Sequence, residues 1–186
     1  MKIFNILLFS LLMLSTQVFA QNKGPRKSLQ ASVGQTIGAD TKITINYSRP
    51  GVKGRTVWGE IVPMGMYPAR SDDGKPYPWR GGADENTTFE TSKDITIDGK
   101  DLPAGKYGLH FIAGEKEWIV IFSKTNDSWG SYSYDEANDA LRITVKPVEA
   151  PHQEWLTYGF DDLAGTSATA YLHWEKKKIP FIVAVK

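Results

Sequence analysis

The residues best suited to chemistry gather in one segment, 76–88, which reads Pro-Tyr-Pro-Trp-Arg-Gly-Gly-Ala-Asp-Glu-Asn-Thr-Thr. Arg80 supplies a planar fork of donors that can hold a carboxylate or a phosphate, and Trp79 supplies a ring that can stack on a sugar or an aromatic group. The glycine pair lets the backbone bend or approach another group closely. Two carboxylates and an amide follow: Asp84, Glu85 and Asn86. Segment 76–88 therefore has the composition of a binding loop.

The same segment can also form a structural corner. Arg80 can pair with Asp84 or Glu85 inside the loop, while Trp79 closes one end of the fold. We favour this structural interpretation, because an arginine–carboxylate bond offsets the conformational entropy lost when a long loop is fixed.

A second cationic segment spans residues 49–55 and combines three cations with a proline and two glycines. Such a turn can bind an anion. We expect instead that Arg49 or Arg55 pairs with Asp84 or Glu85 across the fold, since buried charge is usually compensated internally.

Histidines could provide proton transfer or metal binding, and the chain has three of them and no cysteine. His110 and His173 each lie in an expected strand, opposite its apolar neighbours. If those strands adjoin, the two imidazoles could bind zinc together with Glu85. The spacing matches no metal motif, so we expect the histidines to bond to neighbours or water, and we predict no metal and no other cofactor.

Catalysis by a nucleophile has little support, because the chain has neither cysteine nor a Gly-x-Ser-x-Gly elbow. The strongest enzymatic alternative is a hydrolase-like site in which Glu85 acts as acid or base with Arg80 and His110. We expect Glu85 to be an ordinary ionised carboxylate held by cations, and we assign no catalytic residue.

Six tryptophans could include a carbohydrate platform, although the core of a β-sandwich normally contains several. We assign Trp118 and Trp174 to the core. Trp129, in the run Trp-Gly-Ser-Tyr-Ser-Tyr, is the better exposed candidate.

The first twenty residues have the pattern of a secretory signal, with Lys2, an apolar run and a small-residue cleavage site before Gln21. The apolar run is too short to span a bilayer, so we expect an exported protein without a membrane span, periplasmic or extracellular. Residues 21–28 are then expected to form a basic mobile tail, and residues 29–186 one domain.

The charges of the 22 basic and 21 acidic residues nearly cancel, and this near-zero net charge argues against nucleic-acid binding.

Apolar and polar residues alternate along most of the domain, and this period of two predicts strands. The run from Trp118 to Phe122 is apolar on both faces, which predicts a central strand covered from two sides. The expected strands cover residues 43–47, 95–97, 106–112, 118–122, 141–145, 154–160, 168–174 and 179–184. Turns are expected at Asp98-Gly99 and Ala113-Gly114. We predict an all-β fold, a single antiparallel β-sandwich of jelly-roll type, with at most one short helix near residues 134–140.

Several separated motifs occur in a fixed order. They are Tyr47-Ser48-Arg49-Pro50-Gly51-Val52-Lys53-Gly54-Arg55, Trp58-Gly59, Ile61-Val62-Pro63, Trp79-Arg80, Gly82-Ala83-Asp84-Glu85-Asn86-Thr87, Leu102-Pro103-Ala104-Gly105-Lys106-Tyr107, Glu117-Trp118, Trp129-Gly130 and Tyr134-Asp135. In this order they resemble the family called domain of unknown function 2911, over roughly residues 29–186. The resemblance implies exported proteins, mostly from Bacteroidota, without an established activity, cofactor or catalytic residue.

This chain departs from the family pattern in two places. The family pattern usually reads Gly-Ala-Asn-Glu, and this chain has Asp84 in place of the asparagine, which adds a negative charge. The segment 66–78 also looks longer than in the shorter members.

From the residues and the resemblance together we expect a non-catalytic binding or interaction module with its site at the 76–88 loop. Its partner would be a small molecule, a glycan or an envelope protein. The alternatives are the hydrolase-like enzyme and a purely structural partner of another envelope protein.

Overall fold

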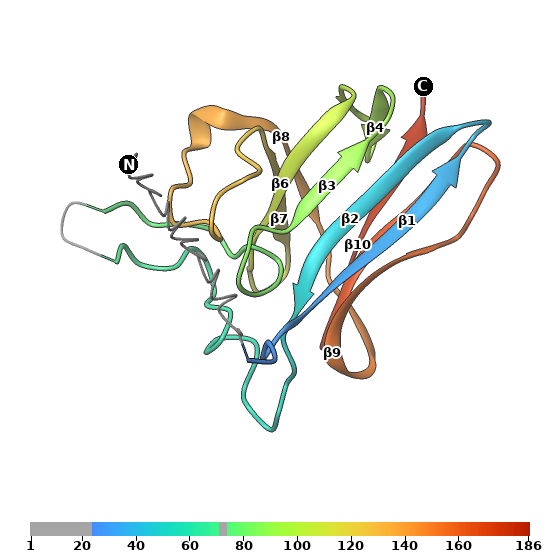
Figure 1. Cartoon of the computed structure of the whole chain (residues 1–186). Helices are drawn as coiled ribbons and strands as arrows, with labels where there is room; N and C mark the ends of the chain where they lie inside the picture. Colours follow the sequence, from blue (N-terminus) through green and yellow to red (C-terminus); the bar gives the residue numbers. More distant parts are fainter. Residues whose placement is uncertain (1–23, 71–73) are drawn as a thin grey trace, which may run out of the picture.

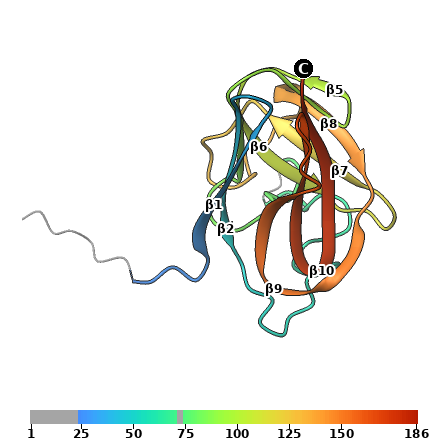
Figure 2. The ribbon, with the colours of Figure 1, turned by 90° about the vertical axis from the view of Figure 1, so that its right-hand side faces the viewer.

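The chain forms two antiparallel β-sheets that pack face to face, as Figures 1 and 2 show from two sides. The structure is a computed structural model that describes residues 24–70 and 74–186, and in these ranges it contains ten strands and one 3-10 turn. One sheet has six strands in the order β1-β2-β3-β6-β7-β8, and the other has four in the order β5-β4-β10-β9. The predicted all-β sandwich is confirmed, while the jelly-roll connection stays a prediction.

Most predicted strands are present, but strands 29–37 and 100–102 were not predicted, and the predicted strands 168–174 and 179–184 form one continuous strand. The six-stranded sheet contains β1 (Leu29–Ile37), β2 (Thr41–Arg49), β3 (Thr88–Thr91), β6 (Gly105–Ile112), β7 (Trp118–Ser123) and β8 (Asp139–Val145). The four-stranded sheet contains β4 (Ile95–Ile97), β5 (Lys100–Leu102), β9 (Val148–Asp161) and β10 (Ser167–Val185). The expected helical segment is a single 3-10 turn, η1 (Glu136–Asn138). Among the described residues no helix is long and apolar enough to cross a membrane.

One hydrophobic core fills the space between the sheets. Alternate residues of each strand point inward, because successive side chains of a strand lie on opposite faces. The largest fully buried side chains come from both sheets: Trp118, Trp174, Phe89, Phe111, Phe122 and Phe181. The predicted core positions of Trp118 and Trp174 are therefore confirmed.

Turn chemistry agrees with the predicted hairpins. Asp98 and Gly99 join β4 to β5 with φ angles of 46° and 76°. Two consecutive positive φ angles match the right-handed twist of a two-residue hairpin, which explains the Asp-Gly pair. The expected hairpin at Ala113-Gly114 is also present, because it joins the paired strands β6 and β7.

The outer face of the six-stranded sheet is covered in part by the connection between β7 and β8. In this connection the ring of Tyr134 lies 5.8 Å from that of His110 on β6. Ile121, on the same outer face of β7, is fully buried. The prediction of a central strand covered on both sides is therefore confirmed for β7.

The longest connection, between β2 and β3, positions the candidate site. It leaves the sandwich at the lower end of β2 in Figure 1 and runs from teal to green before it returns to β3. The predicted signal segment 1–20 lies outside the described residues, as does the start of the expected tail.

Candidate functional site

The loop 76–88 first runs beside β6 in line with β3. The backbone of Trp79 forms a pair of hydrogen bonds with that of Phe111, with N···O distances of 2.9 and 2.7 Å. This pairing turns the indole of Trp79 into the core, where it is only 4% exposed and stacks on Trp174 at 5.9 Å between ring centroids. Trp79 therefore closes the end of the sandwich, as one of the two interpretations expected.

The glycine pair then brings the loop backbone against the core. Gly81 has φ of 62°, and a Cβ atom there would lie 2.6 Å from the ring of Phe111. Its carbonyl accepts a hydrogen bond of 2.8 Å from the buried hydroxyl of Tyr158. A side chain at this position would thus be both strained and overpacked.

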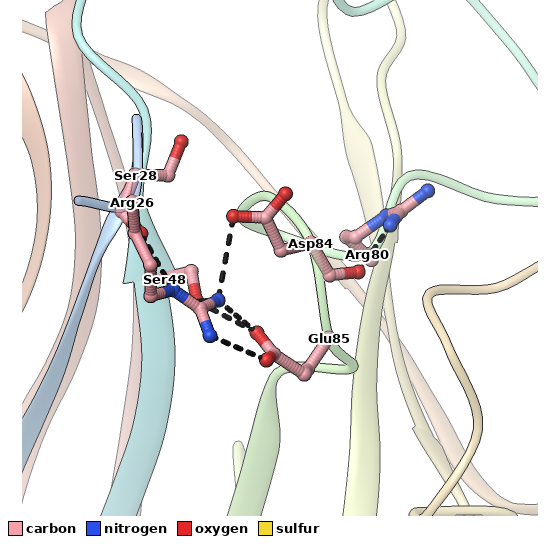
Figure 3. Close-up of polar contacts among 6 residues, drawn as sticks. All are labelled: Arg26, Ser28, Ser48, Arg80, Asp84 and Glu85. Carbon is pink, nitrogen blue, oxygen red and sulfur yellow. Dashed lines mark hydrogen bonds and ion pairs between the residues drawn. The ribbon is translucent and has the colours of Figure 1, made fainter. Parts of the chain in front are cut away.

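Both carboxylates of the loop are bound by a residue that precedes the first strand. The guanidinium of Arg26 donates to both carboxylate oxygens of Glu85 and, at 3.4 Å, to Asp84 (Figure 3). Ser48 adds a hydrogen bond of 3.2 Å to Glu85. The hydrogen bonds from Arg26, more than any other contact, lower the pKa of Glu85 to about 2.

Asp84 has a left-handed backbone conformation, with φ of 60°. Asparagine and aspartate tolerate this conformation better than most residues. Asp84 therefore suits the turn, and its carboxylate lies beside the guanidinium of Arg26.

The expected pairing of Arg80 with a loop carboxylate is wrong. Its guanidinium points away from the carboxylates of Asp84 and Glu85 and donates to the backbone carbonyl of Asp84 (Figure 3). It lies 4.8 Å from the ring centroid of Tyr132 and packs against the backbone of Gly130. The turn at Asp84 directs the two carboxylates toward Arg26, on the opposite side of the loop from Arg80.

The expected pairing of Arg49 or Arg55 with Asp84 or Glu85 is also wrong among the described residues. Arg49 donates through Nε to the carbonyl of Leu156 at 2.8 Å, which ties the end of β2 to β9. Arg55 donates to the carbonyls of its own turn, Val52 at 3.1 Å and Gly51 at 2.6 Å. Backbone oxygens are nearer to both guanidiniums than any carboxylate of the loop.

Asn86 and His110 lie beneath the connection between β7 and β8. Asn86 is 8% exposed, and its amide donates to the carbonyl of Thr125 at 3.4 Å. His110 is 2% exposed, and burial followed by repulsion from Arg80 lowers its pKa to about 4. The imidazole is therefore neutral near pH 7.

The two strand histidines do not meet. His110 lies on β6 of the six-stranded sheet, and His173 lies on β10 of the four-stranded sheet, where its Nε2 is 2.9 Å from the carbonyl oxygen of Pro151. Both point away from the core, so the whole sandwich separates them. Among residues 24–70 and 74–186 no three histidine or acidic side chains are grouped as metal ligands.

A cavity of about 690 Å³ is lined by residues of both segments that we selected from the sequence, 49–55 and 76–88. From segment 49–55 it is lined by Lys53 and Arg55, and from the 76–88 loop by Trp79, Arg80 and Asp84. The connection between β7 and β8 adds Trp129, Ser131 and Tyr132, and the residues before β1 add Lys27 and Ser28. Glu85 and Asn86 line a second hollow, of about 360 Å³, and His110 lines neither.

The structure also adds residues that sequence reasoning missed. Arg26 and Lys27 belong to the expected tail, and Tyr67 and Tyr77 to the long connection between β2 and β3. The two tyrosine rings stack at 5.2 Å, and Tyr77 packs edge-on against Tyr132 at 5.1 Å. The local signal for Tyr77 was the run Pro76-Tyr77-Pro78, because the flanking prolines restrict the path of the backbone at the tyrosine.

The family model described as "Protein of unknown function (DUF2911)" matches residues 28–183. This chain belongs to the DUF2911 family. The match includes segments 49–55 and 76–88 and every residue that lines the cavity except Lys27, so nearly all of the cavity lies within the family domain. Neither the curated proteins nor the solved structures contain a match to this DUF2911 protein.

Proposed function

We propose that this protein is a non-catalytic binding module whose site is the cavity at the 76–88 loop. The observation that carries the proposal is that two segments selected for their chemistry, 49–55 and 76–88, line one cavity of about 690 Å³. Small-molecule sites commonly have volumes of about 300–1,000 Å³ and combine apolar walls with a few polar groups. This cavity has aromatic walls and four cationic side chains.

The state of Glu85 supports binding over catalysis. A general acid or base works best with a pKa near the working pH, whereas Arg26 lowers that of Glu85 to about 2. Glu85 also lies outside the residues that line the cavity with Arg80. The hydrolase-like alternative is tested by offering chromogenic glycosides, esters and phosphates to the protein and to Glu85→Gln. Turnover that Glu85→Gln abolishes would overturn the binding proposal.

The direct test of binding is a thermal-shift screen of small organic compounds against the purified protein. Selective binding to the folded state raises Tm by mass action. Ala83 lines the cavity, so Ala83→Phe is expected to fill part of it and abolish the shifts. Ala104→Phe, at an exposed turn, is the matched control and should keep them. Hits that survive Ala83→Phe, or no hits at all, would contradict the proposed site.

We also propose that the protein is exported after cleavage before Gln21. The pattern of Lys2, an apolar run and Val18-Phe19-Ala20 supports this compartment. Protein recovered from the cell envelope or the medium should begin at Gln21. N-terminal sequencing that finds Met1–Ala20 intact there would contradict the proposal.

A further inference from the structure

We infer that the cavity binds a ring-bearing organic anion, a compound in which an acidic group is attached to a sugar or aromatic ring. The inference rests on the proposed function and names the chemical class of its ligand. Three features of the cavity carry it: its charge, its unused donors and its exposed rings.

The charge of the cavity is strongly positive. Four cationic side chains line it: Lys27, Lys53, Arg55 and Arg80. None of them forms an ion pair with a carboxylate of the described residues. The one carboxylate in the lining, Asp84, lies beside the guanidinium of Arg26. Lys53 has a partial counter-charge in nearby Glu154, whose pKa it helps to lower, and its ammonium lies 5.3 Å from the ring centroid of Trp155. The cations still outnumber the acidic groups around the hollow, and such an excess raises the local concentration of anions.

Two of these cations, Arg55 and Arg80, are held in place by hydrogen bonds that use only some of the N–H donors of each guanidinium. Arg55 donates through Nε and Nη2 to backbone carbonyls, and Arg80 donates through Nη1 to the carbonyl of Asp84. The remaining donors of each guanidinium have no hydrogen-bond partner among the described residues. Contact with Tyr132 and Gly130 fixes the plane of Arg80. A guanidinium held in this way loses little conformational entropy when it binds a carboxylate or phosphate.

Exposed aromatic side chains stand beside these cations. Trp129 is 60% exposed and lines the cavity with Tyr67, Tyr77 and Tyr132. The guanidiniums of Arg70 and Arg80 lie 4.2 and 4.8 Å from the ring centroid of Tyr132, and Tyr67 stacks on Tyr77, so the ring of Trp129 is the one available to a ligand. An exposed aromatic face can stack on a sugar or aromatic ring. A simple inorganic anion would meet the cations but leave most of about 690 Å³ and all of the aromatic surface unused. The combination therefore favours an anion that carries a ring.

Titration calorimetry with matched probes tests this inference. The acidic probes are trigalacturonate and indole-3-acetate, their neutral counterparts are galactotriose and indole-3-acetamide, and citrate is an anion without a ring. We expect at least one acidic probe to bind about tenfold more tightly than its neutral counterpart and than citrate. Raising the salt concentration should weaken that binding, because the contacts are ionic. The acidic probe that binds shows whether the ring is a sugar or an aromatic group.

Variants locate the contact. Lys53 and Arg55 are exposed side chains, so Lys53→Gln and Arg55→Gln should fold normally and lower the affinity for the acidic probe severalfold. Lys106→Gln, an exposed cation that does not line the cavity, is the matched control and should bind like the wild type. Arg80→Gln should lower the affinity most, provided that its melting curve shows a folded protein.

The results of these binding experiments distinguish a failure of the inference about ligand class from a failure of the proposed binding function. Equal affinity for acidic and neutral probes, equal affinity for citrate, or no binding of either acidic probe would overturn the inference. The proposed function stands in these cases if neutral or cationic compounds still raise Tm in a manner that Ala83→Phe abolishes. In this screen the proposed function fails if no compound does so.

Discussion

At the scale of single residues, Arg26 controls the electrostatics of the loop. It contacts Asp84 and Glu85 together, although 58 and 59 residues separate them from it in the chain. The contact leaves Arg80 free of both carboxylates and available to the cavity. An ion pair as exposed as this one contributes little to stability, because solvent screens it, so we expect its main effect on the charge of the site.

The first prediction concerns the pKa of Glu85. Arg26→Gln removes the hydrogen bonds that lower it, so the pKa should rise from about 2 toward its ordinary value of 4.5. A carbon-detected NMR titration of the Glu85 carboxyl measures the change. Lys93→Gln, which breaks the exposed Lys93–Asp40 pair, is the control. A Glu85 pKa that is unaltered in Arg26→Gln would show that Arg26 does not hold the carboxylate in solution.

The contact between Arg26 and Glu85 also determines how the stability of the fold changes with pH. The pKa of Glu85 is lower in the folded than in the unfolded state, so its contribution is fully present above about pH 4.5. The contribution is lost as the pH falls from there toward 2. Solvent screening limits it to the small value of an exposed pair.

The second prediction concerns His110, whose pKa is lowered from 6.5 to about 4. Between these values the unfolded state binds more protons, so stability should fall as the pH falls from 6.5 to 4. The loss is at most about 1.4 kcal/mol per pH unit. In His110→Gln this part of the slope should be absent. Denaturant unfolding of both proteins at several pH values measures it, and parallel curves would contradict the burial of a neutral imidazole near Arg80 and Tyr134.

The core positions of strand residues were predictable from the sequence, but the partners of the charged loop side chains were not. Trp118 and Trp174 were assigned correctly to the core, because large aromatic side chains in the strands of a β-sandwich are normally buried between its sheets. The partners of Arg80 depended on the path of the backbone at Asp84, which no local pattern reveals. Arg26 was missed because it lies outside the predicted strands and makes its contacts with a distant loop.

At the scale of elements, the glycine pair anchors the 76–88 loop to the sandwich. Gly81 lies against Phe111 of β6 and Tyr158 of β9, which belong to different sheets. The loop is thus fixed to both layers at the point where it borders the cavity.

The third prediction follows from this packing. Gly81→Ala should destabilise the protein by about 2–4 kcal/mol, because the new methyl group is overpacked and the backbone has a left-handed conformation. Gly54→Ala is the matched control, since φ is 69° there and a Cβ atom would meet nothing within 4 Å. It should cost only the backbone strain, about 1–2 kcal/mol. Equal losses of stability in urea unfolding would show that Gly81 is not packed as described.

Elements with a strong period were the most predictable. β2, β4, β6, β7 and β8 each lie close to their predicted ranges, and the 3-10 turn falls within the predicted helical segment. The length of β9 was underestimated, and β10 was predicted as two strands, 168–174 and 179–184. The pairing of Lys177 and Lys178 with Glu149 and Val148 extends β9 and joins the two halves of β10 through charged residues. These polar parts of β9 and β10 are held as strands by backbone pairing with each other, and a local sequence pattern does not reveal such pairing.

At the scale of the whole molecule, the cavity forms where distant segments meet at one end of the sandwich. Its lining comes from the residues before β1, the long connection between β2 and β3, and the connection between β7 and β8. The sequence identified two of these segments by composition. Their meeting could not be predicted, because it depends on the strand order of the six-stranded sheet.

The most direct test of the cavity as a binding site is backbone and arginine side-chain NMR. The purified protein would be titrated with trigalacturonate or indole-3-acetate, whichever binds more tightly. We predict the largest shift changes in residues 51–55, 79–84 and 129–132, and in the Nε–H signals of Arg55 and Arg80. Changes concentrated at the opposite end, around the Asp98-Gly99 turn, or at the hollow beside Glu85 and Asn86, would contradict the cavity as the site.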